Sequence, residues 1–261
     1  MNTIIIRSIT GLLYASIILS SLYYDSKLFS FIIFIFSCLS TYEYKKLIGM
    51  KSFIEYILLG IIFYYYSIKN FNNDLIIYIL FITLASHIFM LKWLFFKKYK
   101  NNLINHFLTY GYMVFGCFFI IAVPFSKGDY NPQLLLFVFL INWFNNSFAY
   151  LLGKNFGKNK LLPSVSPNKS WEGFWGGLFF SLIAAFILYK LQIDIRLSNI
   201  LICSILIPVL ATLGDLIQSK IKRDAGVKDS GYILPGHGGF YDRMDSIIFI
   251  APWMFFIFNT F

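Results

Sequence analysis

Residues 198–218 read SNILICSILIPVLATLGDLIQ, an apolar run that contains one acidic side chain, Asp215. As a helix this run would be about 30 Å long, which matches the hydrocarbon core of a bilayer. An ionisable group at such a depth is energetically costly and marks a functional site by default. The run therefore predicts a membrane-spanning helix, and Asp215 is the first candidate site residue.

Similar apolar runs recur along the whole chain, which has 261 residues, 58% of them hydrophobic and only 13% charged. Lipid cannot satisfy unpaired backbone groups, so each run is expected to be helical. The sequence predicts an all-α, polytopic transmembrane helical bundle of about nine helices, forming a single membrane domain over 1–261. Five helices would form an N-terminal part, 1–128, and four helices with cytoplasmic loops a catalytic part, 129–261. The predicted spans are 4–24, 28–46, 53–68, 74–96, 103–126, 132–153, 174–191, 198–218 and 243–261.

The basic residues predict the orientation of these spans. With nine crossings, 17 of the 22 Lys and Arg residues fall on the side of the N-terminus and five on the other side. The positive-inside rule then puts the N-terminus in the cytoplasm and the C-terminus outside. A cleaved signal peptide is the alternative for 1–24, but the apolar stretch after Arg7 is too long for one. We expect an integral protein of the cell inner (plasma) membrane with its site on the cytoplasmic side.

The net charge of +10 does not form one continuous basic face, because the Lys and Arg residues lie in short loops between apolar runs. This distribution argues against nucleic acid as a partner and favours attraction to anionic head groups or nucleotides. The three cysteines lie inside apolar runs without CxxC spacing, which predicts neither a disulfide framework nor a metal site.

Acidic residues concentrate near the end of the chain, where five of the twelve lie between Asp215 and Asp245. On a helix, Asp215 shares a face with Ser219 and Lys222. Asp242 and Asp245 are three residues apart where the last helix begins, although one of them could simply cap that helix. Three carboxylates gathered there would suit Mg²⁺, a hard cation that prefers oxygen ligands, and a second metal ion is possible in such a cluster.

The two long cytoplasmic loops, 154–173 and 219–242, add phosphate-binding chemistry. In the second, Leu234-Pro235-Gly236-His237-Gly238-Gly239 is either an ordinary turn or, beside its basic neighbours, a phosphate cradle. In the first, Lys169 precedes a glycine-rich helix start, a placement that suits a nucleotide or phosphate. Asn142 and Asn146 share a face of the sixth span and mark either a helix contact or a wall of the site.

Taken together, these residues resemble the phosphatidate cytidylyltransferase (CDP-diacylglycerol synthase) family. The resemblance is carried by SKIKRDAGVKDSGYILPGHGGFYDRMD, 219–245, with support from Gly214-Asp215-Leu216 and from FGKNKLLPSVSPNKSWEG, 156–173. It covers 142–253 well and the first five spans only in hydropathy. One departure is Asn146, which stands where the family commonly has an acid, and an amide there would weaken any cation ligation by that position.

The resemblance implies that CTP and phosphatidic acid give CDP-diacylglycerol and pyrophosphate with the help of Mg²⁺. It assigns Asp215 and Asp242 to metal binding, with Asp245 as a further ligand or a support. Lys222, Arg223, Lys228 and Arg243 would neutralise phosphates. The remaining expected substrate contacts are Ser166, Lys169, Ser219, Asp229, His237, Gly238, Gly239 and Asn146. The expected partners are CTP, phosphatidic acid and membrane lipids, with a homodimer left open.

Two other functions remain as alternatives. A CTP-dependent polyprenol or phytol kinase would also need basic loops and embedded acids, but the full 219–245 signature argues against it. A transporter would place polar groups near the membrane midplane, often in inverted repeats. In this sequence the polar cluster lies at one face, and no repeat is evident.

Overall fold

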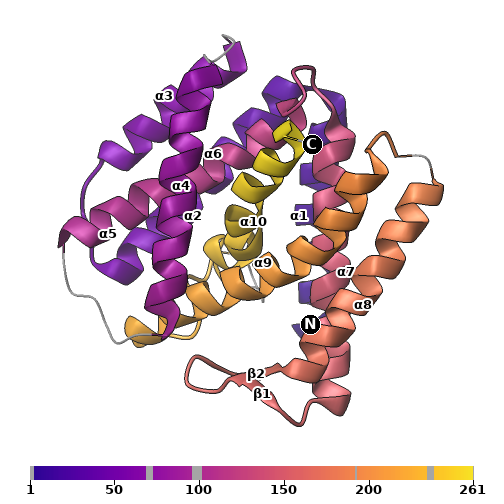
Figure 1. Cartoon of the computed structure of the whole chain (residues 1–261). Coiled ribbons are helices and arrows are strands. Elements are labelled where there is room, and N and C mark those ends of the chain that lie inside the picture. Colours follow the sequence, from indigo (N-terminus) through magenta and orange to yellow (C-terminus); the bar gives the residue numbers. More distant parts are fainter. Residues whose placement is uncertain (1–2, 69–72, 96–101, 192, 234–237, 261) are drawn as a thin grey trace.

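The computed structural model describes residues 3–68, 73–95, 102–191, 193–233 and 238–260. Helices dominate these residues and pack into one bundle (Figure 1). The α-helices are α1 Thr3–Tyr24, α2 Ser26–Ile48, α3 Ile54–Ile68, α4 Asn73–Phe95, α5 Asn102–Leu108, α6 Phe115–Ala122, α7 Pro132–Phe156, α8 Trp171–Lys190, α9 Leu197–Asp224 and α10 Tyr241–Thr260.

The described residues of each of the nine predicted ranges are largely helical, and six helical segments among them are long and apolar enough to cross a membrane. These six are Ser26–Ile48, Asp74–Phe95, Leu103–Phe125, Pro132–Phe156, Trp171–Lys190 and Leu197–Asp224. Ile9–Tyr24 and Ile54–Ser67 form shorter apolar helices. The chain is thus a polytopic helical membrane protein, while nine crossings and a cytoplasmic N-terminus stay predictions.

The predicted span 103–126 is helical but irregular. Between α5 and α6 lies a π-helical segment, η1 Thr109–Val114, and a 3-10 turn, η2 Val123–Phe125, follows α6. Gly111 allows η1 to approach α4, because a Cβ at that position would lie 2.6 Å from Cβ of Ser86. π-Helical insertions often accompany functional sites. Here the insertion lies beside α10, where the hydroxyl groups of Tyr112 and Tyr241 are 3.1 Å apart.

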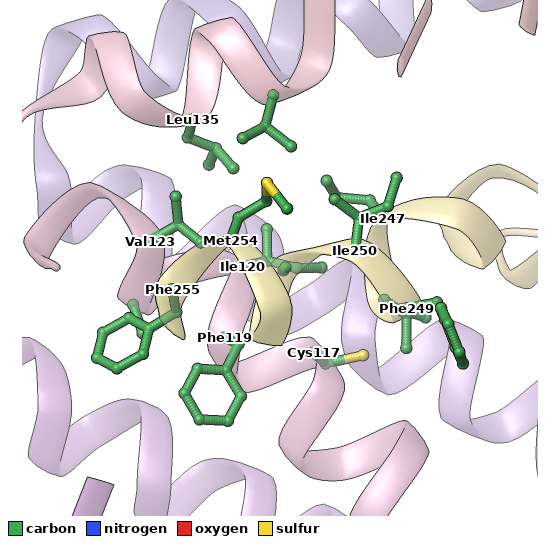
Figure 2. Packing of buried hydrophobic residues seen from close by; sticks show 14 of the residues in the cluster. Cys117, Phe119, Ile120, Val123, Leu135, Ile247, Phe249, Ile250, Met254 and Phe255 are labelled. Carbon is green, nitrogen blue, oxygen red and sulfur yellow. The ribbon is translucent and has the colours of Figure 1, made fainter. Parts of the chain in front are cut away.

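The core is built around α10, which runs through the middle of the bundle (Figure 1). Its apolar residues pack against α6 and α7, as Figure 2 shows for Met254 near Leu135 and for Ile250 near Ile120. Gly116 of α6 lets the two helices approach closely, since a Cβ there would lie 2.8 Å from Cγ2 of Ile248. The helix that carries two of the predicted site acids is therefore held rigidly by its apolar part.

A second close contact joins α7 to α8, and the connection between them forms a small antiparallel hairpin, β1 Lys160–Leu162 and β2 Ser166–Ser170. Ser170 ends the hairpin and caps α8, accepting a hydrogen bond from the backbone N–H of Gly173 at 3.2 Å. The all-α prediction is incomplete at this hairpin, because Pro163 and Ser164 favour a turn and the short segments on either side of them pair as strands. The three cysteines are free, as the sequence predicted.

Candidate functional site

Two of the predicted acids meet between α9 and α10. The hydroxyl group of Ser246 lies 2.6 Å from Oδ1 of Asp215 and 3.3 Å from Oδ1 of Asp245, so it joins the two carboxylates. Gly214 makes this approach possible, because a Cβ there would lie 3.2 Å from the backbone oxygen of Asp245. Two carboxylates from neighbouring helices are thereby fixed side by side in a partly buried position.

The β1–β2 hairpin brings a lysine to this pair. Val165, at the hairpin tip, packs with Leu94 of α4 and Leu216 of α9, which anchors the hairpin next to Asp215. Nζ of Lys169 then lies 2.6 Å from Oδ2 of Asp215. Their side chains are 28% and 22% exposed, so the ion pair remains within reach of water and of an incoming ligand. The sequence predicted both residues for the site but not their contact.

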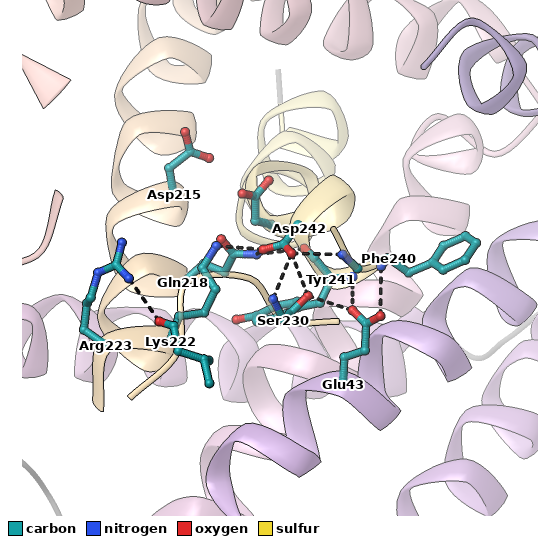
Figure 3. A network of polar contacts seen from close by, with 12 residues as sticks. Glu43, Asp215, Gln218, Lys222, Arg223, Ser230, Phe240, Tyr241 and Asp242 are labelled. Atoms are coloured by element: carbon teal, nitrogen blue, oxygen red, sulfur yellow. Dashed lines mark hydrogen bonds and ion pairs between the residues drawn. The ribbon is translucent and has the colours of Figure 1, made fainter. Parts of the chain in front are cut away.

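Asp242 occupies a different environment, in which its carboxylate accepts four hydrogen bonds and also contacts the hydroxyl group of Ser230 (Figure 3). Nε2 of Gln218 donates to Oδ1 at 3.0 Å, and Nζ of Lys222 at 2.7 Å. The other oxygen accepts from the backbone N–H groups of Gly239 and Ser230, at 3.0 and 2.9 Å. The hydroxyl group of Ser230 lies 3.0 Å from the same oxygen, but its one hydrogen has a nearer acceptor in Glu43, at 2.7 Å. Asp242 therefore ties α9 and the loop before α10 to the first turn of α10.

The sequence missed three members of this network, Gln218, Ser230 and Glu43. Gln218 lies on the same face of α9 as Asp215 and Lys222, a spacing that could have identified it. Glu43 is an acid within the second apolar run, and its depth was the available signal. It accepts from the hydroxyl of Ser230 at 2.7 Å and from the backbone N–H groups of Tyr241 and Phe240 at 2.9 and 3.2 Å (Figure 3).

The other predicted residues surround these two clusters or lie apart from them. Several are exposed, and Arg223 donates to the backbone oxygen of Val227 at 3.0 Å. Gly238 has a φ of 83°, which favours glycine, and Gly239 is buried against Glu43. His237 lies outside the described residues. The exposed residues are Arg223, Lys228, Asp229 and Arg243, and the half-buried ones are Ser166 and Ser219.

Asn146 belongs to a chain of amides along α7. It donates to Oδ1 of Asn142 at 3.3 Å and accepts from Asn145 at 3.1 Å. Asn145 in turn faces α8, since a Cβ on Gly177 would lie 2.5 Å from its Oδ1. The amide chain thus reaches the contact with α8, and the role of Asn146 as a substrate contact stays a prediction.

A divalent metal fits the Asp215–Asp245 pair better than it fits Asp242. The pair offers carboxylate oxygens, the donors that Mg²⁺ prefers, and among the described residues an ion there would compete only with the ammonium group of Lys169 for Oδ2 of Asp215. Asp242 is satisfied by its four donors. Within the described part of the chain, no group of three or more His, Cys, Asp or Glu residues is placed to hold one ion. The geometry supports a divalent ion that is held by two acids and takes its remaining ligands from substrate phosphates.

Comparison with known proteins gives a family match over almost the whole chain. The sequence model of the Cytidylyltransferase family matches residues 5–261. A phosphatidate cytidylyltransferase of Staphylococcus aureus (strain COL) is 49% identical over 119 residues, 45% of this chain and 46% of that protein. One of Bacillus subtilis (strain 168) is 39% identical over 146 residues, 56% of this chain and 54% of that protein. The matched segments thus span about half the length of these curated relatives.

Proposed function

The chain belongs to the cytidylyltransferase family, and on that basis we propose that it transfers the CMP group of CTP to phosphatidic acid. The products are CDP-diacylglycerol and pyrophosphate, a reaction of phospholipid biosynthesis. The observation that carries this proposal is the meeting of Asp215 and Asp245 from adjacent helices, with the ammonium group of Lys169 at their edge.

The reaction needs neutralisation of the substrates' negative charge more than it needs a general base. A phosphate oxygen of phosphatidic acid is already anionic near neutral pH, so it can attack the α-phosphorus of CTP without first losing a proton. The bond from that phosphorus to the bridging oxygen then breaks, and pyrophosphate leaves. The obstacle is the repulsion between two anionic substrates, which fixed positive charge must reduce.

The residues of this chain supply that charge from two sides. Lys169 is held on the hairpin and Lys222 on α9, and each is paired with an acid that fixes its position. Arg223, Lys228 and Arg243 lie exposed on the segments that flank Asp242, where phosphate oxygens can reach them. Basic side chains that are ordered before binding bind phosphates at a lower entropic cost.

Asp215 and Asp245 would hold a Mg²⁺ ion, which when bound supplies Lewis-acid stabilisation of the phosphates. Asp242 would then organise Lys222 and the loop before α10, and any metal ligation by Asp242 would require the exchange of one of its four hydrogen bonds. The binding of a second metal ion stays an open prediction. We place the site at the cytoplasmic face of the cell inner membrane, where CTP is available. A homodimer stays an open prediction.

The test separates this reaction from its nearest alternative, a CTP-dependent lipid kinase. Purified protein in lipid nanodiscs is incubated with phosphatidic acid, Mg²⁺ and CTP labelled either on the α-phosphate or on the γ-phosphate. We expect the α-label to appear in the lipid fraction and the γ-label in pyrophosphate. Transfer of the γ-label to a lipid would identify a kinase and refute the proposal, and no transfer of either label would refute both activities. A transporter would leave both labels in CTP.

Lys169 gives a residue-level prediction for the same assay. Lys169→Ala removes a charge-assisted contact worth about 1.5–3 kcal/mol, so the KM for CTP should rise by roughly tenfold or more. Lys160→Ala is the matched control, because this lysine is exposed on the other strand of the same hairpin. Steady-state kinetics over a range of CTP concentrations measure both variants. An equal effect of the two substitutions would show that only the net charge of the hairpin matters.

A further inference from the structure

Glu43 is a buried acid of the N-terminal half that contacts the catalytic half. Its side chain comes from α2, and the residue is only 2% exposed. The carboxylate accepts from the hydroxyl of Ser230, 187 residues away in the chain, and from the N–H groups of Phe240 and Tyr241 (Figure 3). All three donors belong to the loop before α10 or to the first turn of that helix.

The charge of this carboxylate has no basic partner among the ion pairs of the described residues. Lys45, the basic residue nearest in sequence, pairs instead with Glu55 at 2.7 Å. Burial of an unpaired carboxylate is costly unless donors surround it. Two of its three donors are the N–H groups of Phe240 and Tyr241 at the start of α10, where the helix dipole favours negative charge. Glu43, a residue of α2, therefore caps the N-terminus of α10.

Ser230 connects Glu43 to Asp242. Its hydroxyl lies 2.7 Å from Oε2 of Glu43, and its backbone N–H donates to Oδ2 of Asp242 at 2.9 Å. One residue of the loop can therefore satisfy both acids at once, its hydroxyl group serving one and its amide the other. A chain of contacts then runs from α2 through Ser230 to Asp242, and on to Lys222 of α9.

The backbone around Glu43 leaves no room for other side chains. A Cβ on Gly231 or on Gly239 would overlap the Glu43 carboxylate. Tyr241, the first residue of α10, is fixed further by its ring contact with Tyr44, the neighbour of Glu43, at 5.7 Å between centroids. The loop is thus built around the carboxylate of α2, and Asp245 follows one helical turn after Tyr241.

We infer that Glu43 is a positioning residue for the transfer reaction. It holds the segment 238–241 so that Asp242 and Asp245 project from a fixed first turn of α10. In this arrangement the N-terminal half is part of the catalytic assembly and not only a membrane anchor. The inference rests on the proposed function for its kinetic consequence, whereas its structural consequence can be measured without substrate.

The experiment uses the full chain in nanodiscs with the substitution Glu43→Gln. The glutamine amide keeps the shape of the side chain but replaces one acceptor oxygen by an NH₂ group. This group cannot accept a hydrogen bond from the backbone N–H groups that face it. We expect faster hydrogen exchange at the amides of Phe240 and Tyr241, and a kcat lower by about 10²-fold, because small misplacements of reacting groups have effects of that size. The KM for CTP should change by less than about threefold, since Glu43 touches no substrate in this scheme.

Glu55→Gln is the matched control, because Glu55 is also a buried acid and contacts Lys45 rather than the loop before α10. It should lower thermal stability without faster exchange at Phe240 and Tyr241. Ser230→Ala provides a second variant and should reproduce the Glu43→Gln effect in weaker form. The inference is overturned if Glu43→Gln leaves exchange at these amides or kcat unchanged, or if Glu55→Gln reproduces both changes. A wild-type protein that makes no CDP-diacylglycerol would refute the proposed function instead, and the exchange data would still decide whether Glu43 holds this segment.

Discussion

Asp215→Asn should abolish CDP-diacylglycerol formation, lowering kcat/KM by at least about 10³-fold, while the protein still inserts and folds. The substitution keeps the size of the side chain and its hydrogen bond with Ser246, which lies 2.6 Å from Oδ1. It removes the charge that pairs with Lys169 and half of the carboxylate pair with Asp245. The variant should therefore lose affinity for a divalent cation as well as activity.

Two measurements test this prediction independently. One is the rate of transfer of labelled CMP to phosphatidic acid, and the other is binding of Mn²⁺, a spectroscopically visible substitute for Mg²⁺, in the absence of substrate. Asp194→Asn is the control, because Asp194 is exposed in the loop before α9 and its backbone N–H, not its carboxylate, bonds Gln133. Near-normal activity of Asp215→Asn, or unchanged Mn²⁺ affinity, would contradict the metal role of Asp215.

The main acids of the candidate site could be identified from the sequence because their positions follow local rules. Asp215 is conspicuous inside an apolar run, and Asp245 lies three residues after Asp242 at a helix start. Helical periodicity also predicts that Lys222 lies on the same face of the helix as Asp215. In the structure, Gln218 and Lys222 lie on that face and both donate hydrogen bonds to Asp242. These inferences need only the geometry of a single helix.

The partners of these acids could not be predicted, because they come from distant parts of the chain. Helical spacing does not indicate that Lys169 pairs with an acid 46 residues later, or that Glu43 meets a backbone N–H 198 residues later. The expectation that three acids act as one cluster did not include the donors that compete for Asp242. Two of its four donors come from the loop before α10, and no local sequence pattern places them there.

Lys220 has a structural role that the count of basic residues does not reveal. It is one of the 17 Lys and Arg residues that the orientation prediction puts on the cytoplasmic side. In the structure it is 8% exposed and donates to the backbone oxygens of Trp93 and Leu94, at the end of α4. A lysine at a helix C-terminus interacts favourably with the free carbonyl groups. A basic residue can thus satisfy the positive-inside rule and still be part of the packed structure.

Gly239→Ala is the second substitution with a large expected effect, and it tests the local geometry around Asp242. A Cβ at this position would overlap the Glu43 carboxylate and the hydroxyl of Ser230, and both of these groups are buried. The neighbouring chain must then shift, which breaks the hydrogen bond from the Gly239 N–H to Asp242. Overpacking of this kind typically costs about 1–3 kcal/mol, and displacement of Asp242 and Lys222 should reduce activity by about 10²-fold or more.

Gly60→Ala is the matched control for that substitution, because a Cβ on Gly60 of α3 would have no atom within 4 Å. Replacing a helical glycine by alanine at such an open position should be neutral or stabilising by up to about 1 kcal/mol. Thermal unfolding in nanodiscs and the CMP-transfer assay are measured for both variants. Because Gly239 contacts the Glu43–Ser230–Asp242 network directly, its variant should lose far more activity than its change in unfolding temperature would explain. Wild-type activity in Gly239→Ala would mean that the loop before α10 can move away from Glu43 without harm, and that Asp242 does not need this geometry.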